Sequence, residues 1–575
     1  RCIGITQVTI AVNSTADGAA DDGQCTLREA IIAANTDTAS GSTSGECPAG
    51  LGDDTIDLTG VTGTITLTGA PPDIASDIVF DGPGAGNLMV WRDAASGNYR
   101  IFTIEAGATV AMLGLTVSNG LVNDDGGVGG GIYNAGTLTL INSTVISNEA
   151  SFEGGGIYNV SLLTLIDSTV AGNDAHDGGG IFNQRALTLT NSTVVSNGAG
   201  LRGGGIFNYF GCAAELANST IGHNQATSGG GGIYNGGGTL TLKNSTVSGN
   251  SAAQGGGIDT GWGTVELINS TISDNQATSS GGGIASVGDT SYTGTLTLTH
   301  STVGGNSADY GGGIWNDDNA TVKLKNSIIT RNSANSSGPN CHNSAILISL
   351  DYNLVGDDSG CTFTPQANDQ VNVDPLLGEL QDNGGATETR ALLFGSPAVN
   401  AIPIERCTDH RGVPATTDQR GVPRPQGGAC DIGAYELVQS LLYVPLVVRN
   451  YTPPVTFPVH IGDAISQRPV DPQGEVFYTT SVQIPDPLPS GGHFYFSSQR
   501  DAVAEVLIDD ELAVLLDGAD VFSYDFSTSG IPVPAIVEVP RPTMEQLAGR
   551  TVAIEYRDVY GQVVKASEIW LIWTP

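Results

Sequence analysis

The chain has 575 residues, and its 22 basic and 59 acidic side chains give a formal net charge of −37. Such an acidic chain is a poor partner for nucleic acid or an anionic membrane, because both require a basic surface to neutralise phosphate. No stretch approaches the roughly 20 apolar residues of a membrane span, and eight cysteines without a C-x-x-C pair favour disulfides in an oxidising compartment, so we expect a secreted or cell-surface protein.

Residues 1–53 predict a strand followed by a helical cap. The segment QVTIAV (Gln7–Val12) alternates as a strand does. In CTLREAIIAAN (Cys25–Asn35), Thr26 and Glu29 have the spacing of a capping box, and apolar residues follow at helical intervals. The oxygen-rich turns Thr15–Gly23 and Asp124–Gly127 can be read as calcium sites, although neither has EF-hand spacing. We expect no other cofactor.

Residues 54–437 contain an internal repeat with three markers in phase. A Gly-Gly-Gly-Ile unit occurs eight times at steps of 24 to 30 residues, an Asn-Ser-Thr string or a variant follows it, and another asparagine comes six residues later. The isoleucines are Ile132, Ile157, Ile181, Ile206, Ile233, Ile258, Ile284 and Ile314. The strings begin at Asn142, Asp167, Asn191, Asn218, Asn244, Asn269, His300 and Asn326. The last series is Asn148, Asn173, Asn197, Asn224, Asn250, Asn275, Asn306 and Asn332.

Each repeat predicts one coil of a parallel β-helix. Runs such as TLTL (Thr137–Leu140) alternate with period two, which indicates strands, and glycines and asparagines mark the turns between them. Successive coils then stack as parallel strands, with right-handed connections. Ile132 and Asn134 are expected inside and Tyr133 outside, with Asn148 at a bend. The Asn-Ser-Thr strings are formal glycosylation acceptors, but we favour their stacking within strands.

The length variation of the repeat lies on one side. From the first asparagine equivalent to the next isoleucine the step is always 14 or 15 residues, whereas the step from isoleucine to asparagine varies from 10 to 16. Insertions in a solenoid collect on one face, which is often the binding face. The largest are at Tyr209–Ala214 and Ala285–Gly294. Neutral drift in surface loops is the alternative.

Two end motifs resemble those of a known family. CTLREAI (Cys25–Ile31) is similar to the start of bacterial CSLREA-type right-handed β-helix proteins, and TDQRGVPRPQGGACDIGAYE (Thr417–Glu436) resembles the end of the choice-of-anchor Q domain. The repeats are also similar to the GGAI and FxxN repeats of polymorphic outer-membrane adhesins. The resemblance covers most of residues 20–437. It implies a secreted or cell-surface protein and brings no common catalytic residues.

The composition changes after residue 437. Residues 438–455 include LLYVPLVVRNYTPPV (Leu441–Val455), which we interpret as a linker or docking segment. Residues 456–575 contain short alternating runs, among them GEVFYTTSVQI, AEVLIDD and SEIWLIW. These predict an immunoglobulin-like β-sandwich.

Candidate catalytic groups are present but do not form a motif. The acidic pairs and the isolated basic and histidine side chains are Asp124–Asp125, Asp174–Asp177, Asp317–Asp318, Arg185, Arg202, His176 and His223. The acids flank glycine or asparagine, which predicts solvated turns, and the others show no partner. We therefore expect no catalytic residues and no enzymatic activity. The rival hypothesis is a polysaccharide lyase or glycoside hydrolase on a β-helix.

An aromatic series is the best candidate for a binding surface. Its members follow the core isoleucines directly and are Tyr133, Tyr158, Phe182, Phe207, Tyr234 and, after an interruption, Trp315. An outward stripe of rings can bind sugar faces or a protein surface, or it can be covered by loops of the same chain. We expect a structural or adhesive protein that binds surface glycans or self-associates into a filament through Gln7–Val12 and Leu441–Val448.

Sequence proximity predicts three disulfides. Local closure favours Cys25 with Cys47, Cys341 with Cys361, and Cys407 with Cys430. Cys2 and Cys212 remain, and they either join across a folded-back N-terminus or link neighbouring subunits.

Overall fold

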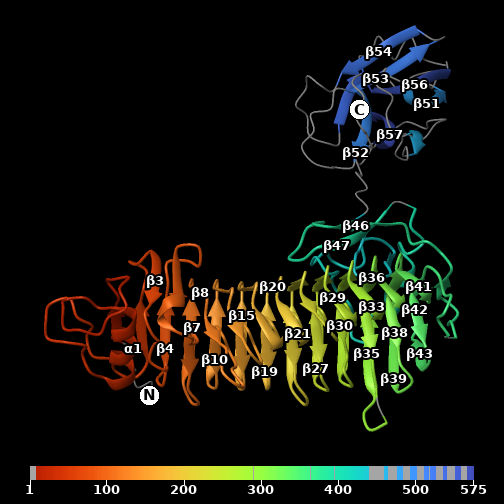
Figure 1. Ribbon diagram of the computed structural model, residues 1–575. Helices are drawn as coiled ribbons and strands as arrows, with labels where there is room; N and C mark the ends of the chain where they lie inside the picture. The colour runs from red at the N-terminus through yellow and green to blue at the C-terminus, as the bar shows by residue number, and fades with distance from the viewer. Residues whose placement is uncertain are drawn as a thin grey trace, which may run out of the picture. The chain divides into compact units, whose positions relative to one another are not determined.

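The computed structural model describes residues 8–438 except 289, 363 and 394, together with eight strands between residues 459 and 574 (Figure 1). The chain divides into two compact units, Arg1–Gln439 and Ser440–Pro575. Leu441–Val455, which the sequence predicts as a linker or docking segment, lies outside the described residues.

The first unit is a parallel β-helix, as predicted, and each of its four sheets takes strands from successive coils (Figure 1). Sheets A and B have 13 strands each. Sheet A consists of β1 (Val8–Ala11), β2 (Asp54–Asp57), β4 (Ile78–Asp81), β7 (Thr109–Leu113), β11 (Thr137–Ile141), β15 (Leu162–Ile166), β19 (Ala186–Thr190), β23 (Ala213–Ala217), β27 (Thr239–Lys243), β31 (Thr264–Ile268), β35 (Gly294–Thr299), β39 (Ala320–Lys325) and β43 (Ile346–Ser349). Sheet B consists of β3 (Gly63–Leu67), β5 (Leu88–Arg92), β8 (Thr116–Ser118), β12 (Thr144–Ile146), β16 (Thr169–Ala171), β20 (Thr193–Val195), β24 (Thr220–Gly222), β28 (Thr246–Ser248), β32 (Thr271–Ser273), β36 (Thr302–Gly304), β40 (Ile328–Thr330), β44 (Leu354–Val355) and β45 (Gln370–Val371).

Sheets C and D complete each coil with shorter strands. Sheet C consists of β6 (Phe102–Ile104), β10 (Ile132–Asn134), β14 (Ile157–Asn159), β18 (Ile181–Asn183), β22 (Ile206–Asn208), β26 (Ile233–Asn235), β30 (Ile258–Asp259), β34 (Ile284–Ser286), β38 (Ile314–Asn316) and β42 (Cys341–Asn343). Sheet D consists of β9 (Leu121–Val122), β13 (Glu149–Ala150), β17 (Asp174–Asp177), β21 (Gly198–Arg202), β25 (Gln225–Ala226), β29 (Ser251–Gln254), β33 (Gln276–Ser280), β37 (Ser307–Tyr310) and β41 (Ser333–Ser337). The variable step of the repeat therefore lies between sheets C and A.

Equivalent residues of the repeat stack in register. Ile132 pairs with Ile157, and Asn134 pairs with Asn159. The side chains of Ile132 and Asn134 are fully buried, whereas Tyr133, between them, lies on the outer face and is partly exposed. The inside–outside assignment made from parity is confirmed.

A column of buried asparagines, Asn148 to Asn332, runs along the bend between sheets B and D. We call it the Asn148 column, and its members are those of the third sequence series. Asn197 donates from Nδ2 to Oδ1 of Asn224 at 2.9 Å, and the same oxygen accepts from the backbone N–H of Asn197 at 2.9 Å. Asn224 in turn donates to Asn250 at 3.0 Å. The column satisfies backbone groups that turn inward, as the sequence predicts.

The Asn-Ser-Thr strings lie at a bend, not within strands as expected. Their first residues take a left-handed backbone, with φ of 48° at Asn142 and 50° at Asn191. Asparagine is one of the few side chains that tolerate this conformation. The amides stack in part, since Asn218 donates to Asn191 over 3.2 Å.

The glycine triplets allow two stacked coils to approach closely. A Cβ atom on Gly205 would lie 2.7 Å from the carbonyl oxygen of Gly232 and 2.9 Å from Nδ2 of Asn224. No side chain fits in that space, so this step of the coil requires glycine.

The N-terminal end is closed by α1 (Leu27–Thr36), with the capping box between Thr26 and Glu29 that the sequence predicts. The strand within Gln7–Val12 is β1, and it pairs in parallel with β2 as the first strand of sheet A. One edge of β1 is therefore occupied by β2. The expectation that this strand is free to pair with another subunit is wrong for that edge.

Residues 373–437 form a cap over the outer side of sheet B, where they pack on Ile328 and Leu354. This segment contains the hairpin β46 (Leu377–Gln381) and β47 (Thr389–Leu392), and the pair β48 (Ile402–Pro403) and β49 (Ala429–Cys430). Short 3-10 turns are present at Ala94–Ser96 and Ile404–Arg406. Thr271 donates from Oγ1 to Oε1 of Gln419 at 2.6 Å, which ties this segment to the strands beneath it.

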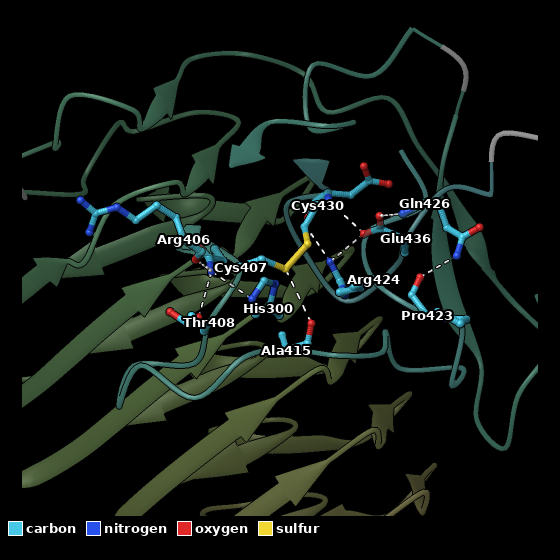
Figure 2. The surroundings of a disulfide bond; sticks show 12 residues. His300, Arg406, Cys407, Thr408, Ala415, Pro423, Arg424, Gln426, Cys430 and Glu436 are labelled. Atoms are coloured by element: carbon cyan, nitrogen blue, oxygen red, sulfur yellow. Dashed lines mark hydrogen bonds and ion pairs between the residues drawn. A yellow bond between two sulfur atoms is a disulfide. The ribbon is translucent and has the colours of Figure 1, made fainter. Parts of the chain in front are cut away.

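The motif Thr417–Glu436 forms a buried network in this cap (Figure 2). Arg424 and Glu436 are almost fully buried and form an ion pair at 3.1 Å. Arg424 also donates to the carbonyl oxygens of Asp431 and Gly433. These residues therefore hold the cap together.

The three predicted disulfides are present. Cys25 is bonded to Cys47, Cys341 to Cys361, and Cys407 to Cys430. Figure 2 shows the third of these within the cap. Cys212 is buried and has no disulfide partner among the described residues, and Cys2 lies outside them.

The described strands of the second unit form two four-stranded antiparallel sheets, consistent with the predicted β-sandwich class. One contains β50 (Val459–Asp463), β57 (Ala566–Thr574), β52 (His493–Arg500) and β55 (Ala535–Val539). The other contains β51 (Val476–Gln483), β56 (Thr551–Asp558), β53 (Asp510–Leu516) and β54 (Ala519–Asp525). Most of the expected strand AEVLIDD lies outside the described residues.

Candidate functional site

A cavity of about 380 Å³ opens on the outer surface of the β-helix, over sheet C. Six aromatic rings, one arginine and one glycine line it. They are Arg202, Phe207, Tyr209, Phe210, Tyr234, Gly236, Trp262 and Tyr292. Tyr209, Phe210, Trp262 and Tyr292 are each between 39% and 50% exposed. A concave surface with large apolar area and one cation is typical of a ligand site.

The floor of the cavity belongs to the predicted aromatic series. Its rings stack along the helix axis, with centroids 5.5 Å apart for Tyr133 and Tyr158, 5.6 Å for Tyr158 and Phe182, and 4.6 Å for Phe182 and Phe207. Tyr234 follows at 4.8 Å. We call these five rings the aromatic column.

The middle of the aromatic column is not an open stripe. Phe182, Phe207 and Tyr234 are at most 7% exposed and form a small core of their own. Tyr209 lies near Phe182 and Phe207, with ring centroids 6.0 and 6.3 Å away. The alternative in which the chain covers its own rings is thus correct for these three, and an outward binding stripe there is wrong.

The exposed rings come from the two insertions and one turn. Tyr209 and Phe210 belong to the segment Tyr209–Ala214, Tyr292 belongs to Ala285–Gly294, and Phe210 and Tyr292 meet edge to face at 5.4 Å. Trp262 lies in the turn after β30, with φ of 73°. These four rings were missed as site residues, although the insertion pattern marked the face on which they lie.

The aromatic column is interrupted at Asp259, which pairs in register with Tyr234. Its side chain is only 4% exposed, and Oδ1 accepts from the backbone N–H of Gly261 at 2.9 Å. Burial raises the pKa of this carboxyl to about 7, against the opposing effects of the Gly261 bond and of Arg202. Asp259 therefore changes its charge near neutral pH.

A second column lies beside the rings, at the position just before each glycine triplet. Glu153, Asp177 and Arg202 pair in register across three successive coils. Burial, and then the charge of Asp177, raise the pKa of Glu153, which also shares a hydrogen bond with Tyr158. The register could have been found by comparing the residues that precede each Gly-Gly-Gly-Ile unit.

Two expectations about this region are corrected. Asp174 and Asp177 lie in strand β17 and not in a turn, because this stretch pairs with β21. His176 has a partner, since its Nδ1 lies 3.0 Å from Oδ2 of Asp177 and its ring stacks on Phe152 at 5.9 Å.

The remaining candidates lie apart from the cavity. Asp124, Asp125 and Asp318 are exposed in turns, as expected, and Arg185 and His223 are exposed on other parts of the coil. Trp315 lies in β38, outside the cavity lining.

The predicted calcium turn uses its carboxylates internally. Asp17 forms an ion pair with Arg28 at 2.8 Å, and Asp21 accepts from Thr43 and Ser42. Among the residues that the structure describes, no three His, Cys, Asp or Glu side chains are grouped so that they could hold a metal ion.

Comparisons with known proteins assign neither a family nor an activity to this chain. No protein-family model and no curated protein match the chain. Among solved structures, the chain is similar to the enzymatically active domain of tailspike protein 4 of bacteriophage CBA120, with a TM-score of 0.24 and 10% identity over 91% of this chain. The match covers 64% of that domain. In the described part of the chain, no helix is long and apolar enough to cross a membrane.

The comparison corrects one expectation from the sequence, namely that the chain is not an enzyme. The neighbour is described as enzymatically active, which is a statement about that protein. At this identity its activity does not transfer to the present chain. The absence of a recognisable motif in the sequence is nevertheless no ground for excluding catalysis, and that expectation is withdrawn.

Proposed function

We propose that this protein binds glycans through the cavity over sheet C, which we call the aromatic cavity. The observation that carries the proposal is the gathering of six rings and Arg202 around about 380 Å³. The C–H faces of a sugar ring pack on aromatic rings, and polar groups at the edge then fix its orientation. Four of the rings remain accessible in the folded chain.

The disulfides and the net charge of the chain support an extracellular location for this cavity. Three disulfides persist only in an oxidising environment. The surface excess of acid keeps such a protein soluble and away from anionic polymers. Filament formation has no comparable support, since one edge of β1 is already paired and Leu441–Val448 lies outside the described residues.

Glycan hydrolysis is a second candidate function, favoured by the pairing of Glu153 with Asp177. Residues in register on neighbouring parallel strands lie about 4.8 Å apart, close to the carboxyl separation of about 5 to 5.5 Å in retaining glycosidases. The raised pKa of Glu153 suits a general acid that protonates the leaving oxygen. Asp177 would then attack the anomeric carbon as the bond to the leaving oxygen breaks, and the deprotonated Glu153 would activate the water that releases the sugar from Asp177.

Binding can be tested on a glycan array with the full chain. We expect the double variant Phe210→Ala with Tyr292→Ala to lose at least tenfold in affinity, because these two rings form one wall of the cavity. Tyr310→Ala is the matched control, since Tyr310 is similarly exposed but outside the lining. Equal loss in both variants, or no binding by the wild type, would refute the proposal.

Hydrolysis needs a separate readout, the release of reducing ends from any glycan that binds. Glu153→Gln and Asp177→Asn should each abolish release while leaving binding intact. Asp318→Asn, in an exposed turn, serves as the control. Binding without release in the wild type would leave a glycan-binding protein and remove the hydrolase.

A further inference from the structure

The aromatic cavity contains an unusual cation. Arg202 ends strand β21 and lines the cavity, with its guanidinium carbon 5.1 Å from the ring centroid of Tyr234. Within the described residues, its side chain makes no hydrogen bond and no ion pair within 4 Å. By contrast, Arg28 and Arg390 each meet a carboxylate, at 2.8 and 2.6 Å.

Such an arginine is left with unused donors. A guanidinium has five N–H groups in a planar fork that matches a carboxylate or a sulfate. The contact with Tyr234 uses the face of the group and leaves its edge open. The chain has 59 acidic and 22 basic side chains. Carboxylates thus outnumber the cations, yet Arg202 in the ring-lined cavity has no ion-pair partner within 4 Å among the described residues.

The next coil brings a carboxylate close to Arg202. Gly229 pairs in register with Arg202, and a Cβ atom there would lie 2.7 Å from Oδ2 of Asp259 and 3.5 Å from the ring of Tyr234. The missing side chain of Gly229 therefore lets Asp259 pack beside Tyr234, the ring on which Arg202 lies.

We infer that the aromatic cavity selects an acidic glycan, whose carboxylate or sulfate binds Arg202 while a sugar face packs on the rings. The inference rests on the proposed glycan binding and adds the substrate class. The net charge of −37 opposes a polymer with contiguous anionic groups. The fitting ligand therefore carries isolated acidic sugars among neutral ones.

Asp259 makes this selection depend on pH. The groups that face it are Arg202, Tyr234 and the backbone N–H of Gly261. Because burial places its pKa at about 7, the carboxyl is neutral at pH 6 and charged at pH 8. The charged form competes with an anionic ligand for Arg202, so binding of the acidic sugar strengthens as the pH falls.

The experiment compares acidic oligosaccharides with neutral counterparts on the full chain. The probes are uronate and sulfated oligosaccharides, each paired with its methyl-esterified or desulfated form. We expect the wild type to prefer the acidic member at least tenfold, and Arg202→Gln to bring the ratio of acidic to neutral affinity to about one. Arg202→Lys should retain part of it, and Arg185→Gln, on an exposed arginine, should change nothing.

Each outcome separates this inference from the proposed function. An acidic preference that survives Arg202→Gln, or a wild type that favours the neutral members, overturns the inference and leaves glycan binding in place. A wild type that binds no glycan overturns both. In Asp259→Asn the increase in affinity between pH 8 and pH 6 should disappear, and its persistence would count against the role of Asp259.

Discussion

The Asn148 column and the aromatic column cross the same coils, yet one is continuous and the other is broken. The Asn148 column faces inward, and each amide satisfies backbone and side-chain groups of the next coil. The aromatic column faces outward and gives way to Asp259 after Tyr234. A polar group that is buried without a partner is costly, so the inner column tolerates no gap.

The difference shows where a β-helix can acquire function. On the outer face a ring can be replaced, a loop inserted or a side chain omitted without leaving core groups unsatisfied. The aromatic cavity takes exposed rings from the two insertions, and Asp259 and Gly229 lie beside Tyr234, one of its lining residues. The predictions below alter one column or one end of the helix at a time.

The largest effect is expected from Asn224→Ala, which opens a gap in the Asn148 column. The change removes the acceptor of two donors of Asn197 and the donor to Val194, all buried. At 1 to 3 kcal/mol for each buried unsatisfied group, the free energy of unfolding should fall by about 4 kcal/mol. Chemical denaturation measures this loss.

The control for this gap is Asn335→Ala. Asn335 is exposed and donates to Asp309 at 2.9 Å on the surface of sheet D. Its loss should change the free energy of unfolding by at most about 0.5 kcal/mol. A similar cost at both positions would mean that burial does not distinguish the two asparagines.

Asp259→Asn tests the break in the aromatic column. Because the pKa of Asp259 is raised to about 7 in the fold, the folded state resists ionisation, and stability is lost as the pH rises from about 4 to 7. The amide keeps the acceptor for Gly261 but has no charge, so the variant should be about 4 kcal/mol more stable than the wild type at pH 8. The difference should shrink towards pH 4 in denaturation curves.

Asp318→Asn is the matched control for this prediction, since Asp318 lies in an exposed turn. It should leave the pH dependence of stability as it is in the wild type. If Asp259→Asn raises the free energy of unfolding equally at pH 4 and pH 8, ionisation of the Asp259 carboxyl does not destabilise the fold.

His300→Asn tests a position at which one repeat has a different residue from its neighbours. His300 replaces the first asparagine of its string and is fully buried under the cap, where its Nε2 accepts from Asn326 at 2.9 Å (Figure 2). Burial, and then the charges of Arg424 and Lys325, lower its pKa. Below the ordinary pKa of about 6.5 only the unfolded chain takes up the proton, so acid destabilises the fold.

The histidine contribution should amount to about 2 kcal/mol between pH 7 and pH 5. His300→Asn should remove it, and hydrogen exchange in residues 295–330 would report the change locally. His223→Asn provides the control, because His223 has a similar left-handed backbone, with φ of 55° against 47°, but is exposed. If the free energy of unfolding of His300→Asn falls between pH 7 and pH 5 as much as that of the wild type, His300 is not the cause of the acid sensitivity.

The sequence was sufficient to predict most of what the repeat determines. Periodic isoleucines, asparagines and glycine triplets report contacts that recur in every coil, so the β-helix, its inner columns and the insertion face could be predicted. The aromatic cavity could not, because Trp262, Tyr292 and Arg202 come together from three different coils. Asp177 was named as a candidate, but its pairing with Glu153 was missed because the two residues are brought together by the register of successive coils and not by a local string.

The smallest effect is expected at the N-terminal end, from Thr26→Ala. Thr26 accepts from the backbone N–H of Glu29 at 3.2 Å, and Glu29 accepts from that of Thr26 at 2.9 Å. Removing such a capping residue costs about 1 kcal/mol. If each coil depends mainly on its neighbours, hydrogen exchange should accelerate in α1 and β1 and stay unchanged near Asn224. Thr26→Ser keeps the hydroxyl and should behave as the wild type. Faster exchange throughout the Asn148 column would instead mean that the helix unfolds as one unit from its cap.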